Sequence, residues 1–196
     1  MQEYRNTGTR WQANCRLHDA LLKASFQRKC NSEREFESYL SGRLDSCPEI
    51  FEQYQFISQF ANDGIRVEPA SAFGIANRPD MAIGTDVTAI ELKYFSDSTG
   101  SFKTAIGQSV VYRIQYGWTF LVCVFGDQLR DRYEEIASGR DKATREICEE
   151  LKNTFKIYTY FFPQSNKLTP GVPGHVAFFP EPSQPQGGEP NSTRED

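Results

Sequence analysis

The sequence predicts an α/β fold in which strands gather in one central sheet and helices pack around it. The first observation is the apolar run 118–125, which is typical of a strand covered on both faces. The second is a pair of short alternating segments, 78–83 and 87–95, joined at a turn around Gly84. The third is that segments with helical apolar spacing precede and follow these strands. Together these patterns favour one sheet flanked by helices.

The chain has 196 residues, a length that suits one domain with a sizeable core. We expect a flexible arm at residues 1–12 and a folded domain at residues 13–179. Residues 180–196 are rich in Pro, Gly, Ser, Gln and Glu, so no core can form there. They are predicted to be a disordered acidic tail.

The sequence shows no apolar run near ~18 residues and no charged leader followed by an apolar stretch. We therefore expect neither a membrane span nor a secretory signal. Five cysteines are widely spaced, with Cys123 in an apolar strand and Cys148 in a helical pattern. This spacing is not that of a disulfide framework, so it favours a reducing compartment and a cytoplasmic location.

The net charge of −4 is divided unevenly along the chain. The tail contributes −3, because four acids outweigh one arginine: Glu181, Glu189, Glu195 and Asp196 against Arg194. Residues 1–43 hold eight Lys and Arg against five acids, a sum of +3. The body is nearly neutral with a basic end, which is compatible with DNA but does not identify a nucleic-acid partner.

Two helices are predicted before residue 45. Leu17, Leu21 or Leu22, and Phe26 recur at helical spacing and predict an amphipathic basic helix from about residue 11 to residue 30. It is either a docked helix with a solvated face or a nucleic-acid contact. Residues 32–35, Ser-Glu-Arg-Glu, form a capping box that predicts a second helix to about residue 44.

The next segment is predicted to enter the sheet. An apolar pattern over residues 50–60 follows Pro48 and predicts a core-packing helix that ends before the turn residues 62–64. Residues 64–70 alternate and predict the first strand, and residues 71–77 a loop. The segments 78–83 and 87–95 are then the second and third strands.

The remaining elements alternate between helix and strand. A helix is predicted from about 102 to 115, with one apolar side expected to pack on the sheet: Phe102, Ile106, Val110 and Ile114. Further helix is expected from 129 to about 155, broken near Gly139 and anchored by Ile136, Ile147 and Leu151. The end of the domain is predicted as a strand at 156–162, a Pro/Gly loop at 166–174 and a short edge strand at 175–179.

The strand pair around Gly84 carries the chemistry. Side chains alternate along a strand, so Glu91 and Lys93 share one surface while Leu92 points the other way. Pairing the two strands across the turn brings the Asp80 carboxylate near that of Glu91. Two close carboxylates repel, and a divalent cation is the usual way to hold both ionised.

The spacing Pro79-Asp80, ten residues, then Glu91-Leu92-Lys93 resembles the motif of the PD-(D/E)XK nuclease superfamily. Gln108 and Tyr112 are similar to the Gln-x-x-x-Tyr element of its RecB-like branch, and residues 36–40 resemble the acidic first helix of its Holliday-junction resolvases. The likeness spans roughly residues 33–125. It implies a restriction endonuclease-like mixed central sheet flanked by helices, with an αβββαβ core.

The resemblance also implies a function, a Mg²⁺-dependent nuclease that hydrolyses DNA, with internal cuts as in an endonuclease or cuts from the ends both left open. Mg²⁺ or Mn²⁺ would be held by Asp80, Glu91 and the carbonyl of Leu92. Lys93 would orient or help deprotonate the attacking water, or stabilise the transition state. The other predicted participants are Glu37 or Glu33 beside the catalytic pair, Gln108 as a catalytic residue, and Tyr112, Lys103 and Arg113 at the substrate.

Alternatives remain open from the residues alone. Instead of a nuclease site, the strand pair can be a surface hairpin with a Glu/Lys pair. Gln108 and Tyr112 can then cap the sheet or complete a polar helix face. The competing function is a catalytically weak or inactive module of the same fold that binds nucleic acid or a partner. A homodimer is compatible with two cuts in a duplex. Cys15 and His18 have the spacing of half a zinc site, but no second pair follows them.

Overall fold

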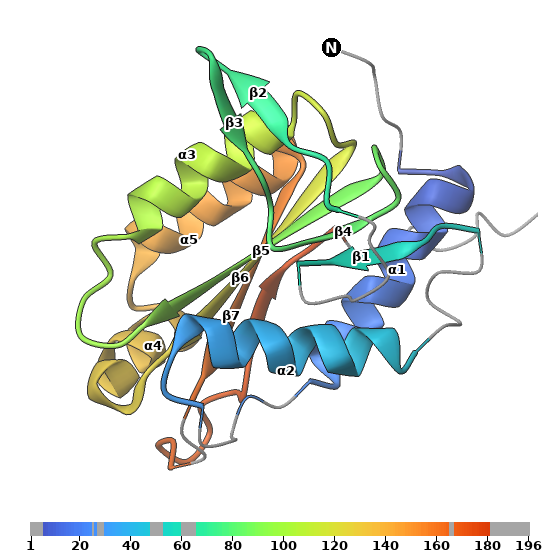
Figure 1. Cartoon of the computed structure of the whole chain (residues 1–196). Helices are drawn as coiled ribbons and strands as arrows, with labels where there is room; N and C mark the ends of the chain where they lie inside the picture. Colours follow the sequence, from blue (N-terminus) through green and yellow to red (C-terminus); the bar gives the residue numbers. More distant parts are fainter. Residues whose placement is uncertain are drawn as a thin grey trace, which may run out of the picture.

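The computed structural model describes residues 6–24, 26, 30–47, 53–59, 66–164 and 167–180. Within them, six strands form one mixed sheet in the order β1-β4-β5-β6-β7-β8, and β2 and β3 form a separate hairpin. Helices cover both faces of the sheet (Figure 1). The predicted α/β class is confirmed.

The strands are β1 (Phe56–Ser58), β2 (Ala70–Ala72), β3 (Ile75–Asn77), β4 (Met81–Ile83), β5 (Thr88–Phe95), β6 (Trp118–Phe125), β7 (Ile157–Pro163) and β8 (Val176–Phe178). The helices are α1 (Gly8–Leu22), α2 (Glu33–Asp45), α3 (Phe102–Tyr112), α4 (Arg130–Ala137) and α5 (Lys142–Glu150). A short 3₁₀ turn, η2 (Asp127–Leu129), precedes α4, and a π-helical segment, η3 (Leu151–Phe155), follows α5.

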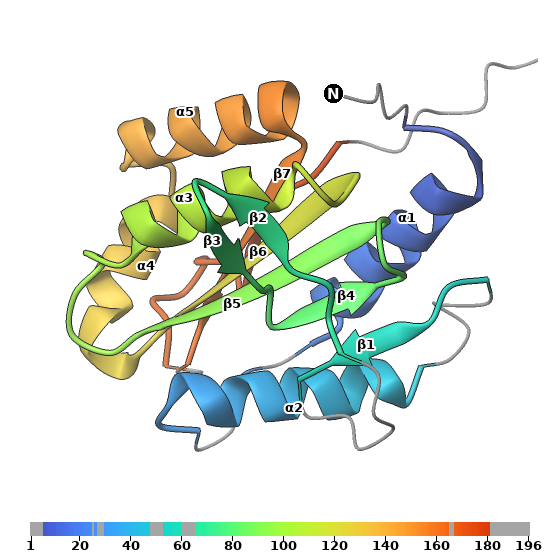
Figure 2. The same cartoon turned by 45° about the horizontal axis from the view of Figure 1, so that its top comes forward.

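The parallel strands β5, β6 and β7 form the centre of the sheet, and β1, β4 and β8 pair antiparallel at its two sides. The crossovers from β5 to β6 and from β6 to β7 run in the same direction across the sheet. Right-handed crossovers then place their helices on one face. Figure 2 shows α3, α4 and α5 on that face, with α1 and α2 on the opposite one.

Strand β6 supplies the core of both layers, since all eight of its residues are buried. Phe120, Val122 and Val124 pack with side chains of α1 and α2, among them Leu17 and Leu40. The intervening residues Leu121, Cys123 and Phe125 pack with α4 and α5. Burying an apolar side chain of this size stabilises the fold by about 1.5–3 kcal/mol. The predicted central strand is confirmed.

Helix α1 differs from its predicted boundaries. It begins at Gly8 and ends at Leu22, whereas a helix from about 11 to 30 after an arm at 1–12 was expected. The earlier start brings Trp11 into the core, where its ring stacks on Phe179 at 5.2 Å between centroids. Phe26 is buried beyond the helix end, so its apolar spacing did not require helical backbone.

Three expectations between residues 50 and 77 are wrong where the structure describes the chain, and residues 50–52 and 60–65 lie outside the described part. Phe56–Ser58 is strand β1 and not part of a helix, because it pairs with the open edge of β4 and a run this short fits either periodicity. Residues 66–69 have no regular structure, and the expected loop 71–77 belongs to the β2–β3 hairpin. Its turn residues Phe73 and Gly74 both have positive φ, 53° and 74°. That turn lacks the usual Asn-Gly signal.

The orientation of α3 differs in part from the prediction, although Phe102 and Ile106 pack against the core as expected. Its buried residues are Ala105, Ser109 and Tyr112, while Val110 and Ile114 are 37% and 66% exposed. Small residues let the helix approach the sheet closely, and Tyr112 turns inward because its hydroxyl finds a partner there.

Other predictions stand. The Ser32 cap of α2, the break at Gly139 and the edge position of β8 are confirmed. Ile147 is an exception, since it is 47% exposed and Cys148 takes the buried position in α5. All five cysteines are free. Within the described residues no helix has the length and apolar character to cross a membrane. The predicted tail from residue 181 onward lies outside the described part of the chain.

Candidate active site

The site lies where β4 begins and the edge of β5 is left without a strand partner. Met81 pairs with Ile90, and no residue of β4 reaches further along β5. Two carboxylates accept hydrogen bonds from the next amides on this edge. The Leu92 amide donates to Asp80 Oδ2 at 2.8 Å, and the Tyr94 amide donates to Glu33 Oε2 at 3.0 Å. The unpaired edge therefore fixes the position of both acids.

Asp80 and Glu91 lie together as the sequence predicts. Glu91 is 2% exposed, and its Oε2 accepts a hydrogen bond from the Tyr112 hydroxyl at 2.8 Å. Burial and the neighbouring Glu91 raise the pKa of Asp80 to about 8. Burial also raises the pKa of Glu91, although Lys93 opposes this shift. Neither acid has enough nearby positive charge to offset its burial.

Lys93 connects Glu91 to α2. Its Nζ lies 3.0 Å from Glu91 Oε1 and 2.9 Å from Glu33 Oε1. Burial alone would lower the pKa of Lys93, but Glu91 and Glu33 outweigh it and raise the pKa above its usual range. The side chain is thus held as an ammonium ion, which can donate hydrogen bonds but cannot accept a proton.

Helix α2 contributes two glutamates to the site. Its start is fixed by Ser32 Oγ, which accepts from the Glu35 amide at 3.3 Å. Glu33 then lies in the first turn and Glu37 one turn later on the same side. Burial and the nearby Glu33 raise the pKa of Glu37, which in turn raises that of Asp80. Sequence reasoning left the choice between Glu33 and Glu37 open, and the structure brings both to the site.

Tyr112 has a different position from the one predicted. It is fully buried, with 0% exposure, so its ring is not accessible to a substrate. Its hydroxyl donates to Glu91 and also lies 3.3 Å from the carbonyl oxygen of Arg78. Tyr112 therefore positions Glu91 from α3. Gln108 lies one turn earlier on α3, and its Oε1 is buried without a hydrogen-bond partner in the described part of the chain.

The two basic residues predicted to contact the substrate, Lys103 and Arg113, have different environments. Lys103 is exposed in the first turn of α3 and remains accessible. Arg113 is engaged within the fold, since its Nε donates to the Phe155 carbonyl at 2.7 Å and another guanidinium nitrogen donates to the Tyr116 carbonyl. These bonds join the end of α3 to the start of β7. These two guanidinium nitrogens are therefore not free to make the predicted contact with a substrate.

Cys15 and His18, the half zinc motif, lie on α1 away from these carboxylates. His18 Nδ1 is 2.8 Å from the Tyr160 hydroxyl, and its ring stacks on Phe179 at 4.1 Å. His175 lies against the ring of Phe162. Both histidines have packing contacts.

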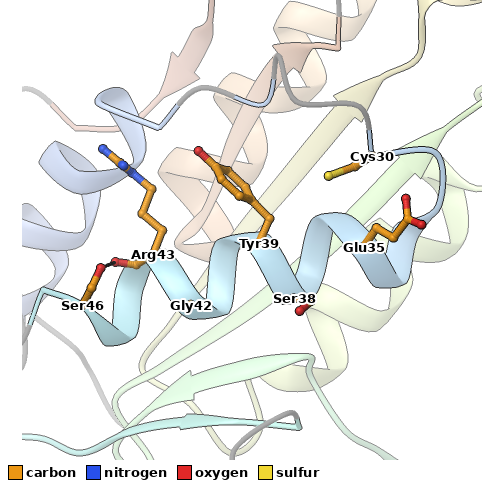
Figure 3. Close-up of a pocket in the computed structure, with 7 residues that line it drawn as sticks. All are labelled: Cys30, Glu35, Ser38, Tyr39, Gly42, Arg43 and Ser46. Atoms are coloured by element: carbon orange, nitrogen blue, oxygen red, sulfur yellow. Dashed lines mark hydrogen bonds between the residues drawn. The ribbon is translucent and has the colours of Figure 1, made fainter.

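A separate hollow of about 600 Å³ lies along α2 (Figure 3). It is lined by Cys30, Glu35, Ser38, Tyr39, Gly42, Arg43 and Ser46. These positions lie on the side of α2 opposite Glu33 and Glu37, given 3.6 residues per turn. The hollow is thus distinct from the carboxylate cluster.

The donor chemistry of the cluster fits a hard divalent cation. Asp80 and Glu91 supply carboxylate oxygens, and Asp80 Oδ1 has no hydrogen-bond partner in the described ranges. The amide and carbonyl of one strand residue point to the same edge, so the Leu92 carbonyl lies on the edge where its amide meets Asp80. No three His, Cys, Asp or Glu side chains of the described residues are already arranged as metal ligands. A cation here would take the Leu92 carbonyl and water as further ligands.

Comparison of the chain with protein-family models, curated proteins and solved structures gives no match. The function is therefore argued from the residues of the site and their geometry.

Proposed function

We propose that this chain is a metal-dependent deoxyribonuclease that hydrolyses DNA phosphodiester bonds with a PD-(D/E)XK site in a restriction endonuclease-like core. One observation carries the proposal. Two carboxyl groups, the half-buried Asp80 and the buried Glu91, meet at the open edge of β5 with raised pKa values, and Lys93 follows Glu91 on the same face of that strand. Such an arrangement is costly for the fold alone and is suited to a bound cation.

The proposed ligands of Mg²⁺ or Mn²⁺ are Asp80, Glu91 and the Leu92 carbonyl. When bound, the cation lowers the pKa of water and neutralises charge on the scissile phosphate. The remaining chemistry belongs to the side chains of the chain itself.

Lys93 and Glu37 have complementary roles in this proposal. The ammonium of Lys93 orients the attacking water and stabilises the charge that develops on the phosphoryl oxygens. It is not the general base, because Glu91 and Glu33 outweigh burial and keep its pKa high. Glu37 is half-buried with a raised pKa, so it is suited to accept the proton of the water as the oxygen attacks phosphorus. The bond from phosphorus to the leaving oxygen then breaks.

Side chains of α3 assist the proposed reaction from the side of the sheet on which Glu91 lies. Tyr112 holds Glu91, and Gln108 has a buried carbonyl oxygen without a partner in the described part of the chain, which would accept a hydrogen bond from an enclosed water. Lys103 is exposed and is proposed to contact phosphate.

The second candidate is a catalytically weak or inactive module of the same fold that binds nucleic acid or a partner. One observation favours it. Both oxygens of Glu91 already have donors, Lys93 and Tyr112, and Lys93 is held by two carboxylates. The cluster is therefore partly satisfied without a cation.

A panel of linear, nicked, branched and single-stranded DNA, incubated with Mg²⁺ or Mn²⁺, separates the two candidates. The nuclease should cut at least one substrate, and Asp80→Asn should abolish the cutting while both proteins bind DNA in Ca²⁺. Asp131→Asn is the matched control, since this side chain is 92% exposed. Binding without cutting by the wild type, with identical behaviour of Asp80→Asn, would instead establish the binding module.

A further inference from the structure

The β2–β3 hairpin presents an aromatic side chain to solvent beside the proposed active site. Phe73 is 100% exposed at its turn, and Ile75 is 63% exposed next to it. The hairpin stands apart from the central sheet and lies over α3 (Figure 2). Most large aromatic side chains of the described residues are buried instead.

Phe73 has a left-handed backbone conformation that is unfavourable for a phenylalanine. Ala72 pairs with Ile75, so Phe73 and Gly74 form a two-residue turn, with φ values of 53° and 74°. Glycine, asparagine and aspartate are the residues suited to this turn, because a larger side chain crowds the left-handed backbone. An exposed phenylalanine gains no packing in return. Fold stability therefore does not explain the ring at this position.

The hairpin is held firmly at its base. The Tyr116 hydroxyl donates to the Glu68 carbonyl at 2.6 Å before β2, and Tyr112 lies 3.3 Å from the Arg78 carbonyl after β3. Tyr112 is also the residue that holds Glu91. One buried side chain thus links the hairpin to the carboxylate cluster.

The chain length between the turn and the site limits their separation to a short stretch of nucleic acid. Six residues lie between Phe73 and Asp80, and the seven steps between their Cα atoms span at most about 23 Å at ~3.3 Å per residue. The separation is therefore at most roughly seven base steps of ~3.4 Å. A strand whose phosphate lies at Asp80 therefore reaches the turn within one helical turn of duplex.

The local chemistry suits a ligand that combines an aromatic base with a phosphate. Residues 69–79 contain no acid, and Arg78 is exposed among them. The neighbours of the ring are small, Ala72 and Gly74, and open space surrounds Gly74. Both faces of the Phe73 ring are thus accessible for stacking, and a nearby cation is suited to phosphate.

We propose that Phe73 stacks on an unpaired base of the DNA substrate, a few nucleotides from the phosphate bound at Asp80. This inference rests on the proposed nuclease function and specifies its substrate class. The preferred DNA has an unpaired base close to the cut, as in a flap, a fork or a single strand, and continuous duplex is a poorer ligand.

The test uses the full-length protein in Ca²⁺ with a flap duplex that carries 2-aminopurine at successive unpaired positions. Wild-type protein should quench the fluorescence at one position by stacking. Phe73→Ala should abolish the quenching and weaken flap binding by about 5- to 100-fold, the range expected for one stacked base. The affinity of Phe73→Ala for continuous duplex should differ from that of the wild type by less than about 2-fold, because a continuous duplex offers no unpaired base for Phe73 to stack on.

Two further variants exclude a structural role. Phe73→Asn should also lose quenching while its melting temperature equals or exceeds that of the wild type, because asparagine tolerates the left-handed turn. Ile75→Ala removes exposed apolar surface without removing a ring, so it should retain the quenching.

The possible failures can be told apart. If wild-type protein binds and cuts flap DNA but Phe73→Ala retains both quenching and affinity, the stacking inference is wrong and the nuclease proposal stands. If Phe73→Ala leaves quenching unchanged and converts a dimer to a monomer in sedimentation, the turn is a protein interface. If the wild type neither binds nor cuts any DNA, both proposals fail.

Discussion

Two acidic regions on the same side of the sheet differ in how the burial of their carboxylates is offset. Glu134 of α4 accepts hydrogen bonds from the Thr169 amide at 2.9 Å and the Thr169 hydroxyl at 2.6 Å. These bonds hold the pKa of Glu134 below its usual value. Glu91 is also buried and Asp80 is half-buried, but desolvation raises both of their pKa values, and Glu91 raises that of Asp80 further.

The difference separates a structural carboxylate from a candidate functional one. Glu134 binds the loop around Thr169 to α4, and its donors replace the lost water. The Asp80–Glu91 pair receives one ammonium from Lys93 and is surrounded by further acids, Glu33 and Glu37. Its remaining negative potential lowers the stability of the metal-free fold, and a cation supplied from solution would offset it.

The largest expected effect comes from the same substitution in the two regions. Glu91→Gln should reduce the proposed DNA cleavage by roughly 10²- to 10³-fold, because it removes the charge of a proposed metal ligand and of one of the two carboxylates that hold Lys93. Glu134→Gln should leave the cleavage rate per folded molecule unchanged but lower the melting temperature. Single-turnover rates and thermal unfolding of both variants measure this. Equal loss of cleavage in the two variants would show that general destabilisation is responsible.

A smaller effect should appear in cation binding. Mg²⁺ at about 100 times its dissociation constant should stabilise the wild-type fold by about 2.7 kcal/mol, provided that it binds only the folded state. Asp80→Asn should lose most of this gain, whereas Glu134→Gln should retain it. Thermal unfolding over a Mg²⁺ titration gives the measurement. A full Mg²⁺ response in Asp80→Asn would exclude Asp80 as a ligand.

The pH dependence of the metal-free protein should sharpen the contrast. The pKa of Asp80 is raised from 3.8 to about 8, so the folded state binds more protons than the unfolded state between these values. The free energy of unfolding should therefore fall as pH rises through this window, and Asp80→Asn should reduce the fall. Glu134 has a lowered pKa, so its contribution is present above 4.5 and is lost as pH falls. Denaturant unfolding in EDTA from about pH 2 to pH 9 tests both signs, and an unchanged slope in Asp80→Asn would contradict the first.

Much of the site was predictable because it depends on local sequence. Alternation along β5 fixes the shared face of Glu91 and Lys93, and the turn at Gly84, with φ 60°, brings β4 back beside β5. The Ser32 cap likewise fixes where α2 begins and hence the positions of Glu33 and Glu37. These features need only strand period, turn chemistry and helix capping.

The remaining features depend on contacts between distant segments. Apolar spacing predicts that Val110 and Ile114 of α3 face the sheet, but the helix turns Tyr112 inward instead. The partner of that hydroxyl, Glu91, is 21 residues away, so no local pattern reveals it. The β2–β3 hairpin was missed because phenylalanine at a left-handed turn position contradicts the usual sequence signal.

The smallest expected effect concerns Tyr112, which connects α3 to Glu91. Tyr112→Phe removes the hydrogen bond to Glu91 and should cost about 1 kcal/mol of stability. Because that bond lowers the pKa of Glu91, its loss should raise this pKa further. Protons then compete more strongly with Mg²⁺, so Mg²⁺ binding should weaken at pH 7 and recover toward pH 9. Tyr116→Phe is the matched control, since its hydroxyl donates to the Glu68 carbonyl and not to Glu91. Calorimetric Mg²⁺ titrations at the two pH values measure the effect, and equal affinities in Tyr112→Phe and Tyr116→Phe would show that Tyr112 supports packing alone.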